Sequence, residues 1–399
     1  MVSIADRLRE RAGLLGPAFV AAIAYVDPGN VATNTQAGAK YGYLLVWVVA
    51  AANAMAGLVQ YLSAKVGLVT GRSLPELLRE RLPRGTRVLY WAQAELVAVA
   101  TDLAEVLGGA IALSILFGLP LLLGGIITGA VSTALLAVQN RAGQSRFERV
   151  ITGLLLVIAV GFVAGLFVAP PEPAKVLEGL VPRFDGVDSL VLAAGMLGAT
   201  VMPHVVYLHS ALARDRFGAD KGKLGVTKAD VGLAMVLAGT VNLAMVLLAA
   251  TALGGHTDAS SLDGVHTAVG DALGAGVALL FAVGLLASGL ASTSVGCYAG
   301  AVVMEGLLRK RVPLLARRVA TLLPAIVVLA LGADPTKALV ASQVVLSFGI
   351  PFALVPLVVL TAKRTVMGDA VNRPGTTAVA GLIAGVVIAL NVALAILTT

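Results

Sequence analysis

Long apolar runs follow one another along the whole chain, separated by short segments that carry charge, proline and glycine. An α-helix of about 20 apolar residues crosses the hydrocarbon core of a bilayer. No connection between the runs is long enough to form a soluble domain. The pattern predicts eleven membrane spans, at approximately 13–39, 43–69, 87–117, 120–138, 149–169, 189–213, 226–254, 272–306, 313–332, 336–361 and 376–398.

Composition supports a membrane protein rather than a soluble helical one. The chain is 58% apolar and 13% charged, and its mean hydropathy is +0.93. The 45 glycines suit close helix packing in lipid, where small residues let backbones approach. The only cysteine, Cys297, excludes an intrachain disulfide and a cysteine-cluster metal site. We expect one polytopic all-α membrane domain over residues 1–399.

The distribution of positive charge predicts the orientation of the chain. With a cytoplasmic N-terminus, every Lys and Arg except Lys40, Lys175, Arg183 and Lys337 falls in an inner segment. This asymmetry is the positive-inside rule. It explains the pI of about 9.7 without a nucleic-acid partner. We expect a multi-pass protein of a bacterial plasma membrane, with an extracytoplasmic C-terminus and a first run that stays as a membrane helix.

Two of the apolar runs contain residues that interrupt a helix. The first run carries Asp27, Pro28, Gly29 and Asn30, and the sixth run carries Pro203. Proline lacks an amide hydrogen and clashes with the preceding turn, so each helix should break there. Backbone groups freed at membrane depth need partners in protein, water or a bound ion.

The spacing of these breaks predicts internal repeats. Each break opens a set of five spans, which gives one repeat at about 13–169, a second at about 189–361 and an extra helix at about 376–398. Because five is odd, the second repeat starts from the opposite side of the membrane and the repeats are inverted. Inverted repeats with interrupted helices place their binding site between the two breaks.

The residues at the breaks suggest a cation site. Asp27 and Asn30 offer oxygens, and carbonyls near Ala24 and Ala199 should be free. Oxygens alone would suit Ca²⁺ or Mg²⁺, whereas the thioether of Met202 favours softer metals such as Mn²⁺ and Fe²⁺. Most of the eight methionines are best interpreted as core filler, but this one precedes the second helix-breaking proline.

The third run contains three carboxylates, Glu95, Asp102 and Glu105. Acids within a membrane span recur in proton relays. Arg317 and Arg318, early in the ninth run, are plausible cations beside them. A static network of buried ion pairs is the other interpretation, and we favour the relay.

Histidine can exchange protons near neutral pH, which suits His204, directly after the second proline, to proton movement. A lone histidine is nevertheless more often a structural residue. His209 is a weaker candidate, and we expect His256 and His266 at the solvated surface.

Polar amides also occur within the apolar runs. Gln343 in the tenth run either completes ion coordination or bonds a neighbouring helix. Asn53, Gln60 and Asn242 are expected to form hydrogen bonds between helices.

Several motifs resemble those of the Nramp family, the natural resistance-associated macrophage protein metal transporters. They are Asp-Pro-Gly-Asn at 27–30 and Met-Pro-His at 202–204, together with the segments at 101–105, 286–289 and 347–353. Each short motif alone is weakly specific, but the first two together, in the first and sixth spans, are highly specific. Leu290 stands where many members carry a glutamine.

The resemblance implies a LeuT-like inverted-repeat fold that moves Mn²⁺ or Fe²⁺ inward with protons, and Met202 argues against the subgroup that carries Mg²⁺. By motif, the implied metal ligands are Asp27, Asn30, Met202, the carbonyls of Ala24 and Ala199, and Gln343. The implied proton pathway comprises Asp27, His204, Asp102, Glu105, Glu95, Arg317 and Arg318.

The resemblance favours proton-coupled metal import by alternating access, and two other functions compete with it. A cation-coupled symporter of amino acids or organic cations would share the fold, but no aromatic cage or carboxylate-binding glycine pair lies beside the first break. A membrane enzyme would need a nucleophile with its base, a second aspartate or a zinc motif. None of these is found, so we expect no enzyme and no cofactor. The partners expected are the metal ion, protons and the bilayer, and no pattern predicts an oligomeric state.

Overall fold

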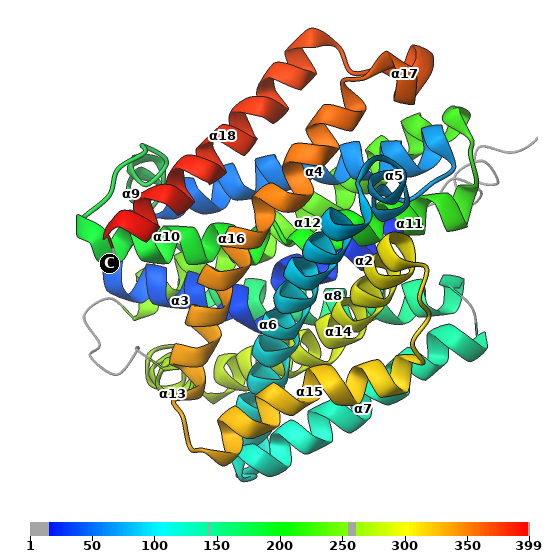
Figure 1. The fold of residues 1–399 in the computed structure, drawn as a ribbon. Coiled ribbons are helices and arrows are strands. Elements are labelled where there is room, and N and C mark those ends of the chain that lie inside the picture. Colours follow the sequence, from blue (N-terminus) through cyan, green and yellow to red (C-terminus); the bar gives the residue numbers. More distant parts are fainter. Residues whose placement is uncertain (1–15, 143, 254–260, 398–399) are drawn as a thin grey trace, which may run out of the picture.

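The computed structural model describes residues 16–142, 144–253 and 261–397, and these residues form helices with no β-strand among them (Figure 1). The first eight elements in chain order are α2 (Pro17–Ile23), η1 (Ala24–Val26), α3 (Pro28–Tyr41), α4 (Val46–Thr70), α5 (Leu74–Arg81), α6 (Arg84–Phe117), α7 (Leu121–Ala142) and α8 (Gln144–Val168).

The remaining elements begin after a short connection. They are α9 (Pro173–Glu178), α10 (Gly186–Thr200), α11 (Pro203–Phe217), η2 (Lys221–Lys223), α12 (Leu224–Ala252), α13 (Leu262–Leu273), α14 (Ala275–Leu308), α15 (Leu314–Ala330), α16 (Pro335–Thr361), α17 (Arg364–Met367), η3 (Gly368–Ala370) and α18 (Pro374–Leu397).

Every expected span corresponds to one helix or to an interrupted pair of helices. In the described part of the chain, eight of these are long and apolar enough to cross a membrane, and two more apolar helices are shorter. The count of eleven crossings and the limits of the two repeats therefore stay predictions. Residues 13–15, 254 and 398 of the expected spans lie outside the described residues, as do Arg7, Arg9 and Arg11. The short helices α5, α9, α13 and α17 in the connections were not predicted.

Both predicted helix breaks are confirmed. In the first, Asp27 has an extended backbone (φ −72°, ψ 169°) between η1 and α3, which starts at Pro28. In the second, α10 ends at Thr200 and α11 starts at Pro203, with Val201 and Met202 outside helical geometry. In each case the proline occupies the first position of the second half-helix, where its missing N–H costs no hydrogen bond.

Side chains from other helices bind the backbone groups that the first break frees. Asn242 of α12 donates to the Tyr25 carbonyl at 2.8 Å, and Ser288 of α14 donates to the Val26 carbonyl at 2.6 Å. At the start of α2, Asp230 accepts the N–H groups of Gly16 and Ala18 at 3.0 and 2.9 Å. The interrupted helix is thus held at both ends of its first half.

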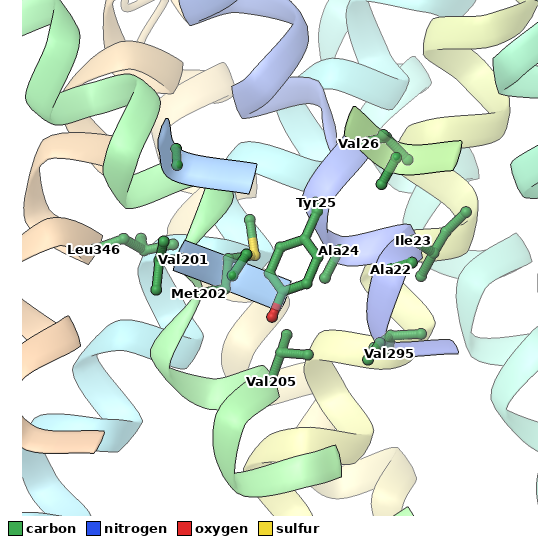
Figure 2. Packing of buried hydrophobic residues seen from close by; sticks show 14 of the residues in the cluster. Ala22, Ile23, Ala24, Tyr25, Val26, Val201, Met202, Val205, Val295 and Leu346 are labelled. Carbon is green, nitrogen blue, oxygen red and sulfur yellow. The ribbon is translucent and has the colours of Figure 1, made fainter. Parts of the chain in front are cut away.

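Glycines let neighbouring helices approach the first break closely. A Cβ on Gly108 of α6 would overlap the ring of Pro28, and a Cβ on Gly29 would overlap the Gln343 amide of α16. A Cβ on Gly198 of α10 would overlap the Gln343 carbonyl. Helices α6 and α16 therefore pack directly against the interrupted helices, and the buried core around η1 and the second break is continuous (Figure 2).

The ends of the helices gather at two opposite sides of the molecule. Helices α5 and α17 lie at the right of Figure 1, whereas α9, α13 and the C-terminus lie at the left. The first group belongs to the segments predicted to face the cytoplasm and the second to those predicted to face outward.

We predict that Gly108→Ala destabilises the protein by about 1–3 kcal/mol, because the added methyl group forces α6 away from the Pro28 ring. Thermal unfolding in detergent, followed by circular dichroism, measures the effect. Gly153→Ala on α8 is the matched control. Its Cβ meets open space, so the helix should gain up to about 1 kcal/mol. Equal effects of both variants would contradict the packing argument.

Candidate metal centre

Asp27 is the one carboxylate within residues 24–30, and one of its oxygens has no partner among the described residues. As the N-cap of α3, its Oδ1 accepts the Asn30 backbone N–H and the Asn30 Nδ2 group, both at 2.8 Å. Its Oδ2 is buried and accepts no hydrogen bond from the described residues. A carboxylate oxygen left bare at this depth is costly unless a cation or a proton binds it.

Asn30 connects the two broken helices. Its Nδ2 also donates to the carbonyl of Ala199 at 2.9 Å, and its Oδ1 accepts the Thr200 hydroxyl at 3.1 Å. The structure thus brings Asp27, Asn30 and Ala199 together, as the sequence predicted. Thr200 was not predicted as a site residue, although it lies within the predicted second break.

Met202 and Ala24 belong to the same buried cluster of side chains. Met202 is the N-cap of α11 and Ala24 begins η1, and both are fully buried. In Figure 2 the Met202 side chain is seen beside the Tyr25 ring of η1, and both residues belong to the same buried cluster. The thioether and the first break are therefore parts of one buried core.

Gln343 of α16 lies beside both breaks. Its amide occupies the space that Gly29 leaves open, and its backbone carbonyl faces Gly198. The Oε1 atom is buried without a partner in the described chain, and Nε2 donates only to the adjacent Ser342 hydroxyl at 3.2 Å. The sequence left open whether Gln343 completes ion coordination or bonds a neighbouring helix. Among the described residues, its side chain forms no hydrogen bond to another helix.

These groups differ from a conventional metal cluster. Among the described residues, no three or more His, Cys, Asp or Glu side chains gather as metal ligands. The arrangement instead combines one carboxylate with amide, carbonyl and thioether donors. Such a set of donors carries a single negative charge. It would therefore leave the charge of a bound divalent cation only half neutralised, which favours release of the ion after binding.

The acids of α6 differ sharply in their partners. Asp102 lies 3.1 Å from Arg318, with both side chains 1% exposed, and Arg318 also donates to the Ser132 hydroxyl at 2.8 Å. Glu95 forms a second pair with Arg317 at 2.9 Å. The plausible cations of the ninth run are thus each opposite one acid, as expected for a buried ion-pair network.

Glu105 is the acid without a cation of its own. Its two carboxylate oxygens, like those of Asp102, are buried and accept no hydrogen bond from the described residues, but Asp102 has the Arg318 charge opposite it and Glu105 has no such ion pair there. The side chain faces Gly296 of α14, where an added Cβ would lie 3.2 Å from Oε2. A static network accounts for Glu95 and Asp102, but it leaves Glu105 as a buried group with an unmet requirement for a proton or a cation.

The histidines of α11 both have one unpartnered nitrogen. His204 Nδ1 lies 3.4 Å from the Thr101 hydroxyl, and His209 Nδ1 lies 2.7 Å from Gln60 Oε1. In each ring Nε2 is buried without a partner among the described residues. His209 was ranked low from the sequence, yet Gln60 also donates to the Tyr25 hydroxyl and so links this histidine to the first break.

Four other polar residues complete the comparison with expectation. Asn242 bonds across helices as predicted, but Asn53 donates to the Val49 carbonyl of its own helix at 2.9 Å, so that prediction is wrong. His266 of α13 is half-buried, not freely solvated. His256 lies outside the described residues.

Comparison with known proteins gives consistent matches. A family profile described as natural resistance-associated macrophage protein-like matches residues 18–397. A relative from Mycobacterium tuberculosis named "Divalent metal cation transporter MntH" is 63% identical over 391 residues, which is 96% of this chain and 91% of the relative.

Solved structures resemble the whole chain. A manganese transporter from Eremococcus coleocola, crystallised with an aromatic bis-isothiourea compound, is 31% identical with a TM-score of 0.86, covering 96% of this chain and 86% of that one. Mhp1, a nucleobase-cation-symport-1 family transporter, is 15% identical with a TM-score of 0.62, covering 96% of this chain and 91% of that one, and shows the fold alone. The predicted fold class, an all-α LeuT-like protein of inverted repeats with two interrupted helices, is confirmed.

We predict that Asp102→Ala destabilises the protein by about 3–5 kcal/mol, because it leaves the Arg318 charge buried and unpaired. The double variant Asp102→Leu with Arg318→Met should recover most of the loss, which a double-mutant cycle of thermal unfolding in detergent measures. The control is Asp188→Ala, which breaks the exposed pair with Lys40 and should cost at most about 1 kcal/mol. Failure of the double variant to regain stability would contradict the ion-pair assignment.

Proposed function

This chain belongs to the natural resistance-associated macrophage protein (Nramp) family, and on that premise we propose that it imports divalent transition metal ions, Mn²⁺ or Fe²⁺, together with protons. The names of relatives such as the Mycobacterium tuberculosis divalent metal cation transporter support the substrate class. The Eremococcus coleocola manganese transporter supports Mn²⁺. The observation that carries the proposal is the bare Oδ2 of Asp27 at the contact between two broken helices.

The metal ion binds where the two breaks meet. Asp27 supplies the one charged ligand and Asn30 a neutral oxygen, after its present hydrogen bonds rearrange. Met202 supplies the sulfur that disfavours Ca²⁺ and Mg²⁺. The carbonyls of Ala24 and Ala199 and the Gln343 amide oxygen complete the set of metal ligands. These oxygens replace water molecules that the hydrated ion loses.

Transport follows from the interruption of the two helices. A metal ion enters from outside, exchanges water for the ligands near the midplane and leaves inward when the half-helices move relative to the rest of the bundle. A membrane potential of 100 mV contributes about 2.3 kcal/mol for each elementary charge that moves inward. The potential therefore favours import of a divalent ion carried with protons.

Protons pass along α6 and the neighbouring face of α11. Asp27 binds either the metal or a proton, and metal binding releases that proton. Glu105 receives it, because this carboxylate has no cation opposite it. Asp102 with Arg318, Glu95 with Arg317, and His204 beside Thr101 continue the pathway toward the cytoplasm.

The setting is the plasma membrane of a bacterium, with the N-terminus in the cytoplasm and the C-terminus outside. The distribution of Lys and Arg among the segments supports this orientation. The protein is a transporter and not an enzyme. Family membership disfavours the alternative of an amino-acid or organic-cation symporter of the same fold.

We predict that Asp27→Ala abolishes Mn²⁺ uptake, because the site loses its only charged ligand. Uptake is followed in proteoliposomes by quenching of an enclosed metal-sensitive dye. Asp188→Ala, an exposed aspartate on α10, should transport normally. Metal uptake by a folded Asp27→Ala variant at the wild-type rate would sink the proposed site.

Met202→Ala should keep Mn²⁺ transport and admit Ca²⁺ or Mg²⁺, because the remaining oxygen ligands suit hard cations. The same liposomes, loaded with a calcium- or magnesium-sensitive dye, measure this gain. Met196→Ala is the matched control, since Met196 is equally buried on α10 but packs in a separate cluster. Continued exclusion of Ca²⁺ by Met202→Ala would falsify the role of the sulfur as a filter.

For Glu105→Gln we expect Mn²⁺ uptake with little accompanying proton entry, because the amide cannot accept the proton released from the site. A pH-sensitive dye inside the liposomes records proton entry driven by an inward Mn²⁺ gradient. Glu178→Gln on the exposed helix α9 should leave both fluxes unchanged. Proton entry at the wild-type ratio in Glu105→Gln would remove this residue from the pathway.

A further inference from the structure

A basic pocket lies away from the metal centre, where the start of α6 meets the end of α14. It has a volume of about 580 Å³. Arg84, Arg87 and Trp91 line it from α6, and Lys310 lines it from the segment after α14. Leu308 and Val312 form part of its apolar wall. The pocket thus combines three positive charges with a hydrophobic surface.

The three cations of the pocket have no acidic partner in the described part of the chain. In the described ranges, Arg84, Arg87 and Lys310 form no ion pair. Neighbouring cations do have partners: Arg79 donates to the Gly306 carbonyl at 2.8 Å, and Arg311 pairs with Glu305. The one acid at the end of α14 is therefore already engaged outside the pocket lining.

Two buried donors at the pocket also lack acceptors. The Nε of Arg87 and the indole Nε1 of Trp91 are shielded from solvent, and neither finds a partner in the described parts of the chain. Buried donors are normally satisfied, so an orphaned pair beside a basic pocket indicates a missing acceptor. The positive end of the α6 dipole, at Arg84, also favours a negative charge here.

The surroundings of the pocket indicate that the acceptor is attached to an apolar body. Val88, which also lines the pocket, is 43% exposed, and Leu89 beside it is 71% exposed. Both lie on the outer surface of a helix long and apolar enough to cross a membrane. Tryptophan at a helix end is typical of the headgroup level of a bilayer. A ligand with an anionic head and acyl chains matches both halves of the pocket.

We propose that this pocket binds the headgroup of an anionic phospholipid of the cytoplasmic leaflet. Its phosphate accepts hydrogen bonds from Arg87 and Trp91 and is neutralised by Arg84 and Lys310. An acyl chain lies along Val88 on the outer surface of α6. Basic pockets between membrane helices on the cytoplasmic side recognise such headgroups.

The bound lipid would connect α6 and α14, two helices that carry residues of the proposed transport site and its surroundings. Helix α6 carries Asp102 and Glu105, and α14 carries Ser288, which binds the freed Val26 carbonyl. A headgroup that contacts both helix ends holds them in one relative position. Lipid binding itself does not depend on metal transport, so the two proposals can fail separately.

Native mass spectrometry of the full chain released from nanodiscs tests the proposal. The nanodiscs contain equal amounts of phosphatidylglycerol and phosphatidylcholine. We expect one phosphatidylglycerol molecule to be retained under conditions that strip phosphatidylcholine. The variant with Arg84→Gln, Arg87→Gln and Lys310→Gln should retain it about a hundredfold more weakly, from the loss of three cations near an anionic surface.

The matched control removes three other cations from segments predicted to face the cytoplasm. Lys221→Gln, Lys228→Gln and Lys363→Gln make the same change in net charge, and all three side chains are exposed outside the pocket. This control should retain the lipid like the wild type. Equal loss of lipid in both triple variants would overturn the pocket, because it would show only general attraction to the membrane surface.

Two further arms complete the experiment. Trp91→Phe keeps the charges and the ring but removes the indole N–H, so retention should weaken by about fivefold, the value of one hydrogen bond. If the triple variant does not fold, unchanged retention by Trp91→Phe overturns the proposal. Displacement of the lipid by millimolar inorganic phosphate would also overturn it, since the ligand would then be a soluble anion.

Discussion

Breaking a helix inside an apolar bundle leaves backbone groups that must be bonded, and this constraint shapes the centre of the protein. Asn242 and Ser288 bind the carbonyls freed at the first break. Asn30 reaches from the first break to the Ala199 carbonyl at the second. The two interrupted helices are therefore each other's hydrogen-bond partners. The polar groups gathered for this purpose are also the donors that a partly dehydrated cation requires.

Asp27 is the single charged group among the neutral donors at the two helix breaks. Asp27 caps α3 through one oxygen and leaves the other bare. A second carboxylate at this contact would repel the first and would bind a divalent ion too tightly for release. The other acids lie instead on α6, where Arg317 and Arg318 balance two of the three. The site with a single charge is thus separate from a helix on which Glu105 is the acid without a cation opposite it among the described residues.

The sequence predicted the features that local chemistry determines. Pro28 and Pro203 each stand beside polar or flexible residues and start a new half-helix, so both breaks could be placed to within a residue or two. Proline alone does not break a helix, because Pro324, Pro351 and Pro356 lie inside continuous helices. Pairing of the α6 acids with the two arginines followed from the cost of leaving either charge alone at membrane depth. Features that depend on contacts between residues far apart in the sequence could not be predicted from local chemistry. The cap that Asp230 supplies to α2 and the hydrogen bond from the Thr200 hydroxyl to Asn30 depend on which helices pack together. Asn53 was assigned across helices because a polar residue in lipid needs a partner, but its own helix supplies one.

The proposed function requires that a transition-metal ion binds between Asp27 and Met202, where the two helices are interrupted. A crystal of the protein soaked in Mn²⁺, with anomalous scattering recorded at the manganese edge, is the decisive experiment. We expect one peak within bonding distance of the Asp27 carboxylate and the Met202 sulfur. A manganese peak at any other place, or a peak beside Asp27 with the Met202 sulfur turned away, would contradict it.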